Sequence, residues 1–246
     1  RGQLVGAQNR NGEWIDRVLQ SVFVDTTKNS SSASYFIHQA GTYRRDGIAQ
    51  PFYSPMLWEN WNQDEKKYET LVWAQQAHIP TNFSSKLLVY QSIRDMGEGV
   101  IEFVKIAYNF GNDTFGFINM PWMGWKKSIL KDRILSNPDG SSYVLNNGED
   151  DWSHQVNKSD TRGWLGLREN VDFMVSHVVG TTPTQKKPDG TSAVSQAGVI
   201  RMPKIKGEDL VVVESILRPN FNPGDAMFSK TFLIINNEQR TKELSN

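Results

Sequence analysis

Short apolar segments rich in β-branched and aromatic residues alternate along the chain with Gly, Pro, Asn and Asp. This pattern is typical of strands separated by turns. It is clearest from Gly99 to Phe110, where Val100, Val104, Ile106 and Tyr108 fall on one face by a period of two. The segment is therefore predicted to be a β-strand.

The same pattern predicts further strands, and turn residues stand between them. The strands are expected at Trp14–Val24, Ser34–Tyr43, Lys67–Gln75, Lys86–Ile93, Phe115–Met120, Val171–Val179, Leu210–Leu217 and Met227–Ile235. Another is expected to open at Thr161–Trp164. Turns are expected at Asp95–Gly99, Asn137–Gly140, Lys187–Gly190 and Asn222–Asp225.

Helical patterns are scarce. One or two helical turns are expected at Glu59–Lys67 and at Trp125–Ile134, and long polar loops at Thr26–Ala33 and Ser136–Thr161. Because helices do not alternate with the strands, a parallel sheet is disfavoured. The sequence predicts an all-β fold, a large antiparallel β-sandwich with few short helices. Residues 1–246 are expected to form one domain, either alone or as part of a longer multidomain protein.

Composition narrows the range of partners. Lys+Arg and Asp+Glu number 27 each, so the basic excess that nucleic-acid binding requires is missing. No apolar run approaches the ~20 residues that span a bilayer. The chain has no cysteine, which excludes disulfides. It begins at Arg1 rather than Met and has no apolar signal stretch, so it is expected to be a mature or trimmed product or a piece of something longer. We predict no nucleic-acid or membrane partner.

Cofactor motifs are absent from the sequence. It contains no GxGxxG, no P-loop, no HExxH and no GxSxG, and zinc sites built on cysteine are impossible. We therefore predict no cofactor. A structural Ca²⁺ at the acidic loop Asn146–Asp151 stays open as an alternative to a solvated turn.

Many tryptophans lie in polar surroundings rather than in apolar runs. These are Trp58, Trp61, Trp122, Trp125, Trp152 and Trp164. A half-exposed ring stacks on the apolar face of a sugar while nearby polar groups take its hydroxyls. The set is expected to contain substrate-binding residues; the alternative is that each ring covers the core at a sheet end.

Four residues are candidates for catalysis. His78 and His154 lie in polar segments and titrate near neutral pH, whereas His38 and His177 lie inside predicted strands and are expected to be structural. Tyr43 and Arg162 stand at predicted strand ends. An arginine that neutralises a uronate, together with a Tyr/His pair that moves protons, suffices for β-elimination. Surface salt bridges are the alternative.

Three further polar residues are expected to bind substrate. Arg44 follows Tyr43, and Gln75 lies just before His78. Glu102 shares the Val100–Tyr108 face, so it is expected to pair with a buried cation or to line a cleft, and Lys105 on the opposite face is excluded as its partner.

Two stretches carry a family resemblance. Arg94–Glu102, running into Tyr108–Gly111, resembles a strand pair of the galactose-mutarotase-like supersandwich domains, and Leu217–Phe228 looks like their closing hairpin. Such domains occur in mutarotases, glycoside hydrolases and polysaccharide lyases. The resemblance implies a supersandwich-like fold and sugar handling. The histidine pattern of true mutarotases is missing, which argues against aldose epimerisation.

These observations predict a secreted or periplasmic carbohydrate-active domain whose partner is a poly- or oligosaccharide. One hypothesis is a lyase or hydrolase that acts on a polysaccharide, with acidic ones among the candidates. A hydrolase would need two positioned carboxylates, and Glu102, Asp150 and Asp151 cannot be separated by sequence. The alternative is a non-catalytic glycan-binding or structural module of a larger enzyme.

Overall fold

The described part of the protein is mostly antiparallel β-sheet in a computed structural model. The structure describes residues 16–25, 34–36, 56–73, 75–76, 87–112, 114–126, 128–137, 139, 141–145, 155–157, 164–170, 173–194, 199–201, 211–217 and 221–245. Within them lie two sheets and a single α-helix, α2 (Glu238–Ser245). The predicted all-β sandwich is confirmed.

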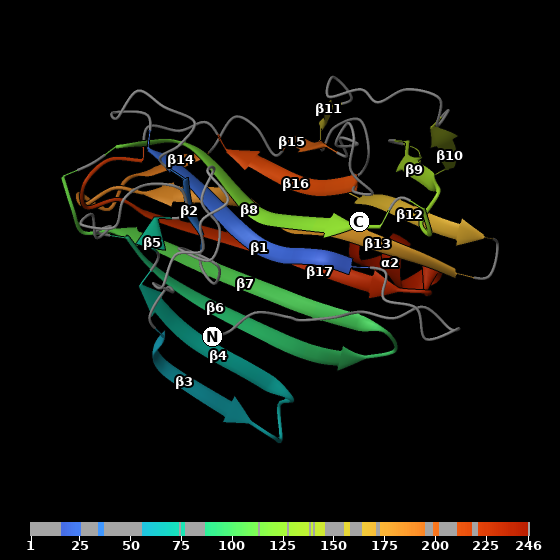
Figure 1. Ribbon diagram of the computed structural model, residues 1–246, viewed down its shortest axis with the longest axis horizontal. Coiled ribbons are helices and arrows are strands. Elements are labelled where there is room, and N and C mark those ends of the chain that lie inside the picture. Colours follow the sequence, from blue (N-terminus) through green and yellow to red (C-terminus); the bar gives the residue numbers. More distant parts are fainter. Residues whose placement is uncertain are drawn as a thin grey trace, which may run out of the picture.

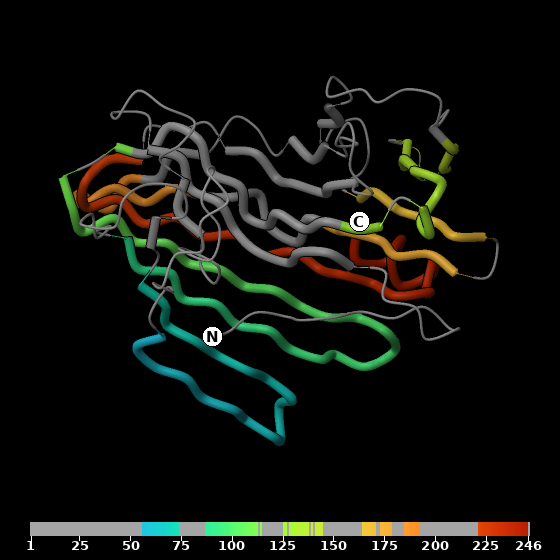
Figure 2. Tube along the Cα trace, in the orientation of Figure 1, coloured from blue at the N-terminus to red at the C-terminus, as the bar shows by residue number. Residues whose placement is uncertain are grey.

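The larger sheet has ten strands, in two groups. One half runs in the order β10 (Ser142–Leu145), β9 (Asp132–Ser136), β12 (Trp164–Asn170), β13 (Phe173–Lys186) and β17 (Ala226–Ile235), with β14 (Ser192–Val194) paired to β13. The other half continues through β7 (Val100–Asn109), β6 (Leu87–Gly97), β4 (Lys67–Trp73) and the edge strand β3 (Met56–Asn62). These last four strands lie side by side at one end of the molecule (Figure 2).

The smaller sheet has seven strands and crosses in front of the larger one in Figure 1. Its order is β11 (Gln155–Asn157), β15 (Val199–Arg201), β16 (Val211–Leu217), β8 (Phe115–Trp125), β1 (Asp16–Asp25), β2 (Ser34–Phe36) and β5 (Gln75–Gln76). The pairings among the described strands of both sheets are antiparallel, as the lack of intervening helices predicted.

The main core lies on the inner face of the ten-stranded sheet, which we define as the face turned toward the seven-stranded sheet. Trp125 at the end of β8 packs there with Phe103, Leu165 and Leu233 from the larger sheet. The indole N–H of Trp125 donates to Nε2 of His177, 3.0 Å away. This buried contact joins the two sheets.

A second core cluster lies on the opposite, outer face of the ten-stranded sheet. Val100, Trp164, Phe232 and Ile234 form it, and Leu244 of α2 packs against it. The helix begins after Asn237, whose side-chain oxygen accepts from the backbone N–H of Arg240 at 3.0 Å, a typical N-cap. The helix therefore packs against β13 on the outer face.

All four predicted turns are present. Gly190 N–H donates to the Lys187 carbonyl at 2.9 Å, and Asp225 N–H to that of Asn222 at 3.0 Å. Ser141 N–H donates to Asp139. Between β6 and β7 the turn residues Glu98 and Gly99 have positive φ angles of 53° and 77°, as a two-residue type I′ hairpin requires.

Four expectations were wrong. Glu59–Lys67 is not helical, because it forms the end of β3, a turn and the start of β4; Trp125–Ile134 joins β8 to β9 through a turn. The stretch Ser136–Thr161 is not one loop, since it contains β10 and β11. Leu217–Phe228 is not a hairpin, because β16 and β17 belong to different sheets.

Candidate functional site

The outer face is open over β3, β4, β6, β7 and the start of β17, away from the helix. Alternate residues of each strand point outward there, and the strand register places them in rows across the sheet. A ligand on this face would contact the side chains of these rows.

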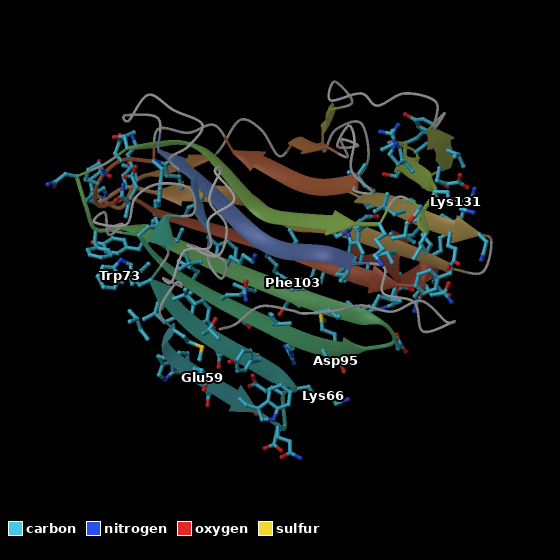
Figure 3. The ribbon with its side chains drawn as sticks, in the orientation of Figure 1. Glu59, Lys66, Trp73, Asp95, Phe103 and Lys131 are labelled. Carbon is cyan, nitrogen blue, oxygen red and sulfur yellow. The ribbon has the colours of Figure 1, made fainter. Side chains whose placement is uncertain are left out.

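Two of the rows are apolar and largely aromatic. One consists of Trp58, Leu71, Tyr90, Ile106 and Phe228; the next consists of Trp73, Leu88, Tyr108 and Ala226. We call these nine residues the aromatic platform. Its longer row crosses five strands, a span of about 20 Å at the usual strand spacing. Figure 3 shows Trp73 at the end of β4 and Glu59 on β3.

Several platform side chains are strongly exposed. The exposed fraction is 47% for Trp58, 38% for Ile106 and 44% for Tyr108. Single exposed apolar residues are ordinary on a protein surface, whereas a contiguous set marks an interaction site. The platform residues are neighbours on adjacent strands of one sheet face, so the platform is a candidate interaction site.

A hydrogen-bonded polar network borders the platform. Both carboxylate oxygens of Glu69 are used: Tyr90 donates its hydroxyl to one, and the Asn60 side-chain amide donates to the other at 3.3 Å. Lys67 lies 3.5 Å from the same carboxylate. The network fixes the orientation of Tyr90 and Asn60 beside the exposed rings.

This network also perturbs two pKa values. The hydrogen bond from Tyr90 is the main cause of a lowered pKa for the Glu69 carboxyl. Burial, together with the bond to Glu69, raises the pKa of the Tyr90 hydroxyl. Glu69 is therefore an ionised acceptor and Tyr90 a neutral donor at ordinary pH.

Charged side chains also lie on the outer face of β7 and β17, next to this network. Glu102 pairs with Lys230 of the neighbouring strand β17, and the two side chains are 12% and 33% exposed. The predicted pairing with a cation is therefore present, though Lys230 is only partly buried. Lys105 is indeed on the opposite face, as expected from the alternation.

The predicted tryptophans separate into two groups. Trp58 and Trp61 are exposed on β3, but they point to opposite sides of the sheet, because Trp58 pairs with Leu71 and Trp61 with Tyr68. Trp125 and Trp164 are fully buried and present no ring face at the surface. The sequence signal, a Trp among polar residues, does not distinguish these environments.

The remaining predicted residues are not brought together by the described part of the chain. Gln75 lies in β5 opposite Phe36, and Trp122 lies in β8 opposite Gln20 and Glu214. Outside the described residues lie His78, His154, Tyr43, Arg162, Arg44, Trp152, His38 and the acidic loop Asn146–Asp151. The catalytic hypothesis that rests on them stays a prediction.

A second polar row lies on the inner face. Thr70, Gln91, Lys105 and Ser229 are neighbours on β4, β6, β7 and β17, and all four are buried. Burial lowers the pKa of the Lys105 ammonium to about 7. At 3% exposure the amine does not reach a polymer in solvent, so it belongs to the stability of the fold.

The lowered pKa of Lys105 predicts a pH dependence. Between pH 7 and 10.5 the unfolded chain binds a proton at this amine that the folded chain does not, so the unfolding free energy rises with pH across that window. We expect a gain of about 2 kcal/mol from pH 7 to pH 9. Urea denaturation at several pH values measures it, and Lys105→Met should remove it.

Lys131→Met is the control for this experiment, because Lys131 is exposed. That variant should keep the pH dependence of the original chain. Equal slopes for Lys105→Met and the unaltered protein would contradict the assignment.

No known protein-family model and no curated protein matches this chain. Across the residues that the structure describes, no group of three or more His, Cys, Asp or Glu side chains could hold a metal ion. The same residues include no helix long and apolar enough to cross a membrane. The aromatic platform with its polar border is the best-defined candidate site.

Proposed function

We propose that this protein binds polysaccharide on the aromatic platform of its ten-stranded sheet. The observation that carries the proposal is the exposure of two platform rings, Trp58 in one row at 47% and Tyr108 in the neighbouring row at 44%. Sugar rings have apolar faces and hydroxyl edges, so they fit a surface that combines aromatic side chains with oriented polar groups.

The shape of the site supports an extended ligand rather than a small one. The platform is a sheet face about 20 Å across, and its polar groups follow one border. A chain that runs across the strands would stack successive rings on Trp58, Tyr90 and Phe228. Its hydroxyls would meet Asn60 and the Glu69–Tyr90 pair.

The border of the site carries both signs of charge. Lys67 and Lys230 are each paired with a carboxylate, while Arg94 is exposed on β6. Because both signs of charge border the site, the binding experiment below uses neutral and acidic polysaccharides. A secreted or periplasmic location and a role as a module of a larger enzyme are parts of the same proposal.

Trp58→Ala and Tyr108→Ala are expected to weaken polysaccharide binding about tenfold or more, since each removes a stacking ring. Affinity electrophoresis measures the retardation of each variant in gels that contain laminarin, xylan, alginate or polygalacturonate. Trp61→Ala is the matched control: it removes a second exposed ring of the same strand, 58% exposed, from the opposite side of the sheet.

Retardation that is lost in Trp61→Ala but kept in Trp58→Ala and Tyr108→Ala would refute the platform. Absence of retardation by all four polymers would refute the function. The same polymers are assayed for unsaturated ends and reducing sugar, so that turnover by the predicted His78, His154, Tyr43 and Arg162 is detected separately from binding.

A further inference from the structure

Aromatic side chains occur on every second strand of the aromatic platform. In the longer row, the rings belong to Phe228 of β17, Tyr90 of β6 and Trp58 of β3. The strands between them, β7 and β4, contribute Ile106 and Leu71 instead. Rings and aliphatic side chains therefore alternate across five strands that follow one another in the sheet (Figure 1).

The shorter row has the same interval, offset by one strand. Its two rings are Tyr108 of β7 and Trp73 of β4, and Leu88 of β6 lies between them. On the other side of Tyr108 the row ends at Ala226 of β17. Within the platform, no ring therefore lies directly opposite another ring on a neighbouring strand, and both rows repeat their rings every two strands.

The sheet sets the distance between these rings. Neighbouring strands lie about 4.8 Å apart, so two strand intervals separate the rings of one row by about 10 Å. None of the five rings is buried: Trp58 and Tyr108 are strongly exposed, and Tyr90, Phe228 and Trp73 are partly exposed. Rings held at one interval by a sheet are preorganised, which lowers the entropic cost of binding a ligand that has the same interval.

A β-1,4-linked glucan, mannan or xylan has this interval. Both bonds of its link are equatorial, so the chain is extended and each sugar is turned over relative to the one before it. Every second sugar then presents the same apolar face to a surface, and two sugars extend about 10 Å, the distance between alternate strands. Glucans with β-1,3 or α-1,4 links coil into wide helices, so their sugars do not keep this interval along a row of three rings.

We infer that the polymer bound by the platform is an extended β-1,4-linked polysaccharide that lies across the strands. The inference rests on the proposed polysaccharide-binding function and names its substrate class. The sugars stacked on Trp58, Tyr90 and Phe228 are separated by single sugars that lie over Leu71 and Ile106. Because each strand of the longer row takes one sugar, a pentasaccharide spans the row.

Affinity electrophoresis of the whole chain separates the effect of the link from that of the sugar. Hydroxyethyl cellulose, laminarin and dextran are all glucans, with β-1,4, β-1,3 and α-1,6 links, and xylan and galactomannan add two further β-1,4-linked backbones. A β-1,4-linked polymer should bind about tenfold or more tightly than laminarin and dextran, since only it meets all three rings. Equal or stronger retardation by laminarin or dextran would overturn the inference and leave the proposed function standing, whereas no retardation by any polymer would refute both.

A displaced ring tests the interval itself. Isothermal titration calorimetry measures the binding of cellopentaose, xylopentaose or mannopentaose, whichever matches the polymer that retards the protein most. Tyr90→Leu should weaken binding about tenfold, because the middle ring of the row is lost. Adding Ile106→Tyr to Tyr90→Leu restores three rings but moves the middle one by one strand, so the double variant should bind as weakly as Tyr90→Leu alone. Full recovery in the double variant would show that the number of rings, and not their interval, determines binding, and would overturn the inference.

Discussion

Gly99→Ala is expected to lower the unfolding free energy by about 3 kcal/mol or more. Gly99 has a φ of 77° in the β6–β7 turn, and an alanine Cβ there would lie 2.4 Å from the backbone oxygen of Ile235. The clash is with main chain, so no side-chain rotation relieves it. The Gly99 carbonyl also accepts from Ile235 N–H at 2.8 Å, so the turn and β17 would have to move apart.

Gly97→Ala provides the matched control. Gly97 has almost the same φ, 80°, but nothing lies within 4 Å of its Cβ position. Only the left-handed backbone conformation is penalised, at about 1–2 kcal/mol. Urea denaturation of the two variants should therefore differ by about 2 kcal/mol. Equal losses would show that the close approach to Ile235 does not exist.

Trp125→Ala is expected to lower the unfolding free energy by about 3–5 kcal/mol. The side chain is fully buried between the sheets, packed in the main core cluster and hydrogen-bonded to His177. Burial lowers the pKa of His177 to about 3, so the imidazole is neutral at ordinary pH and its Nε2 is free to accept that bond. The substitution removes the packing and leaves a buried acceptor unpaired.

Two further variants separate the contribution of packing from that of the hydrogen bond and compare a buried indole with an exposed one. Trp125→Phe keeps much of the packing and loses the donor, for an expected cost of about 1–3 kcal/mol. Trp61→Ala removes an indole that is 58% exposed and should cost less than about 1 kcal/mol. Chemical denaturation ranks the three, and a loss for Trp125→Ala no larger than that for Trp61→Ala would contradict the two-sheet core.

Strand and turn prediction succeeded where one physical signal dominates. The alternation at Val100–Asn109 and the Gly-containing turn before it predicted β7 and its hairpin, because period-two patterning and positive φ are local properties. Glu59–Lys67 failed for the opposite reason. Its strand lies at an exposed edge, so it carries no alternating apolar pattern to separate it from a helix.

The helix α2 was not predicted, because it lacks an apolar stripe. It is held by the Asn237 cap and by pairs along its surface, among them Glu238–Lys242 and Arg240–Glu243. The cap residue and the acidic first turn were its sequence signals. Both are weaker signals than a run of apolar residues at helical spacing. The helix is stabilised in addition by the packing of Leu244 against the outer-face cluster.

The candidate site could be predicted only in part. Trp58 was expected to bind sugar, and Ile106 and Tyr108 were placed on one strand face. What the sequence could not show is which side of β7 is buried. Both faces carry apolar residues, and the buried one includes Lys105 and Asn109. Which rings stay exposed depends on which face the second sheet packs against and on where α2 covers the other face, long-range properties that no local pattern contains.

The most direct test of the platform is the methyl NMR spectrum of the protein labelled at its isoleucines. A short oligosaccharide from the polymer that retards the protein most is titrated in. Ile106 lies in the platform and is 38% exposed, so its methyl signal should shift; Ile101, on the other side of the same strand, should not. Saturable binding that leaves Ile106 unshifted would contradict the account.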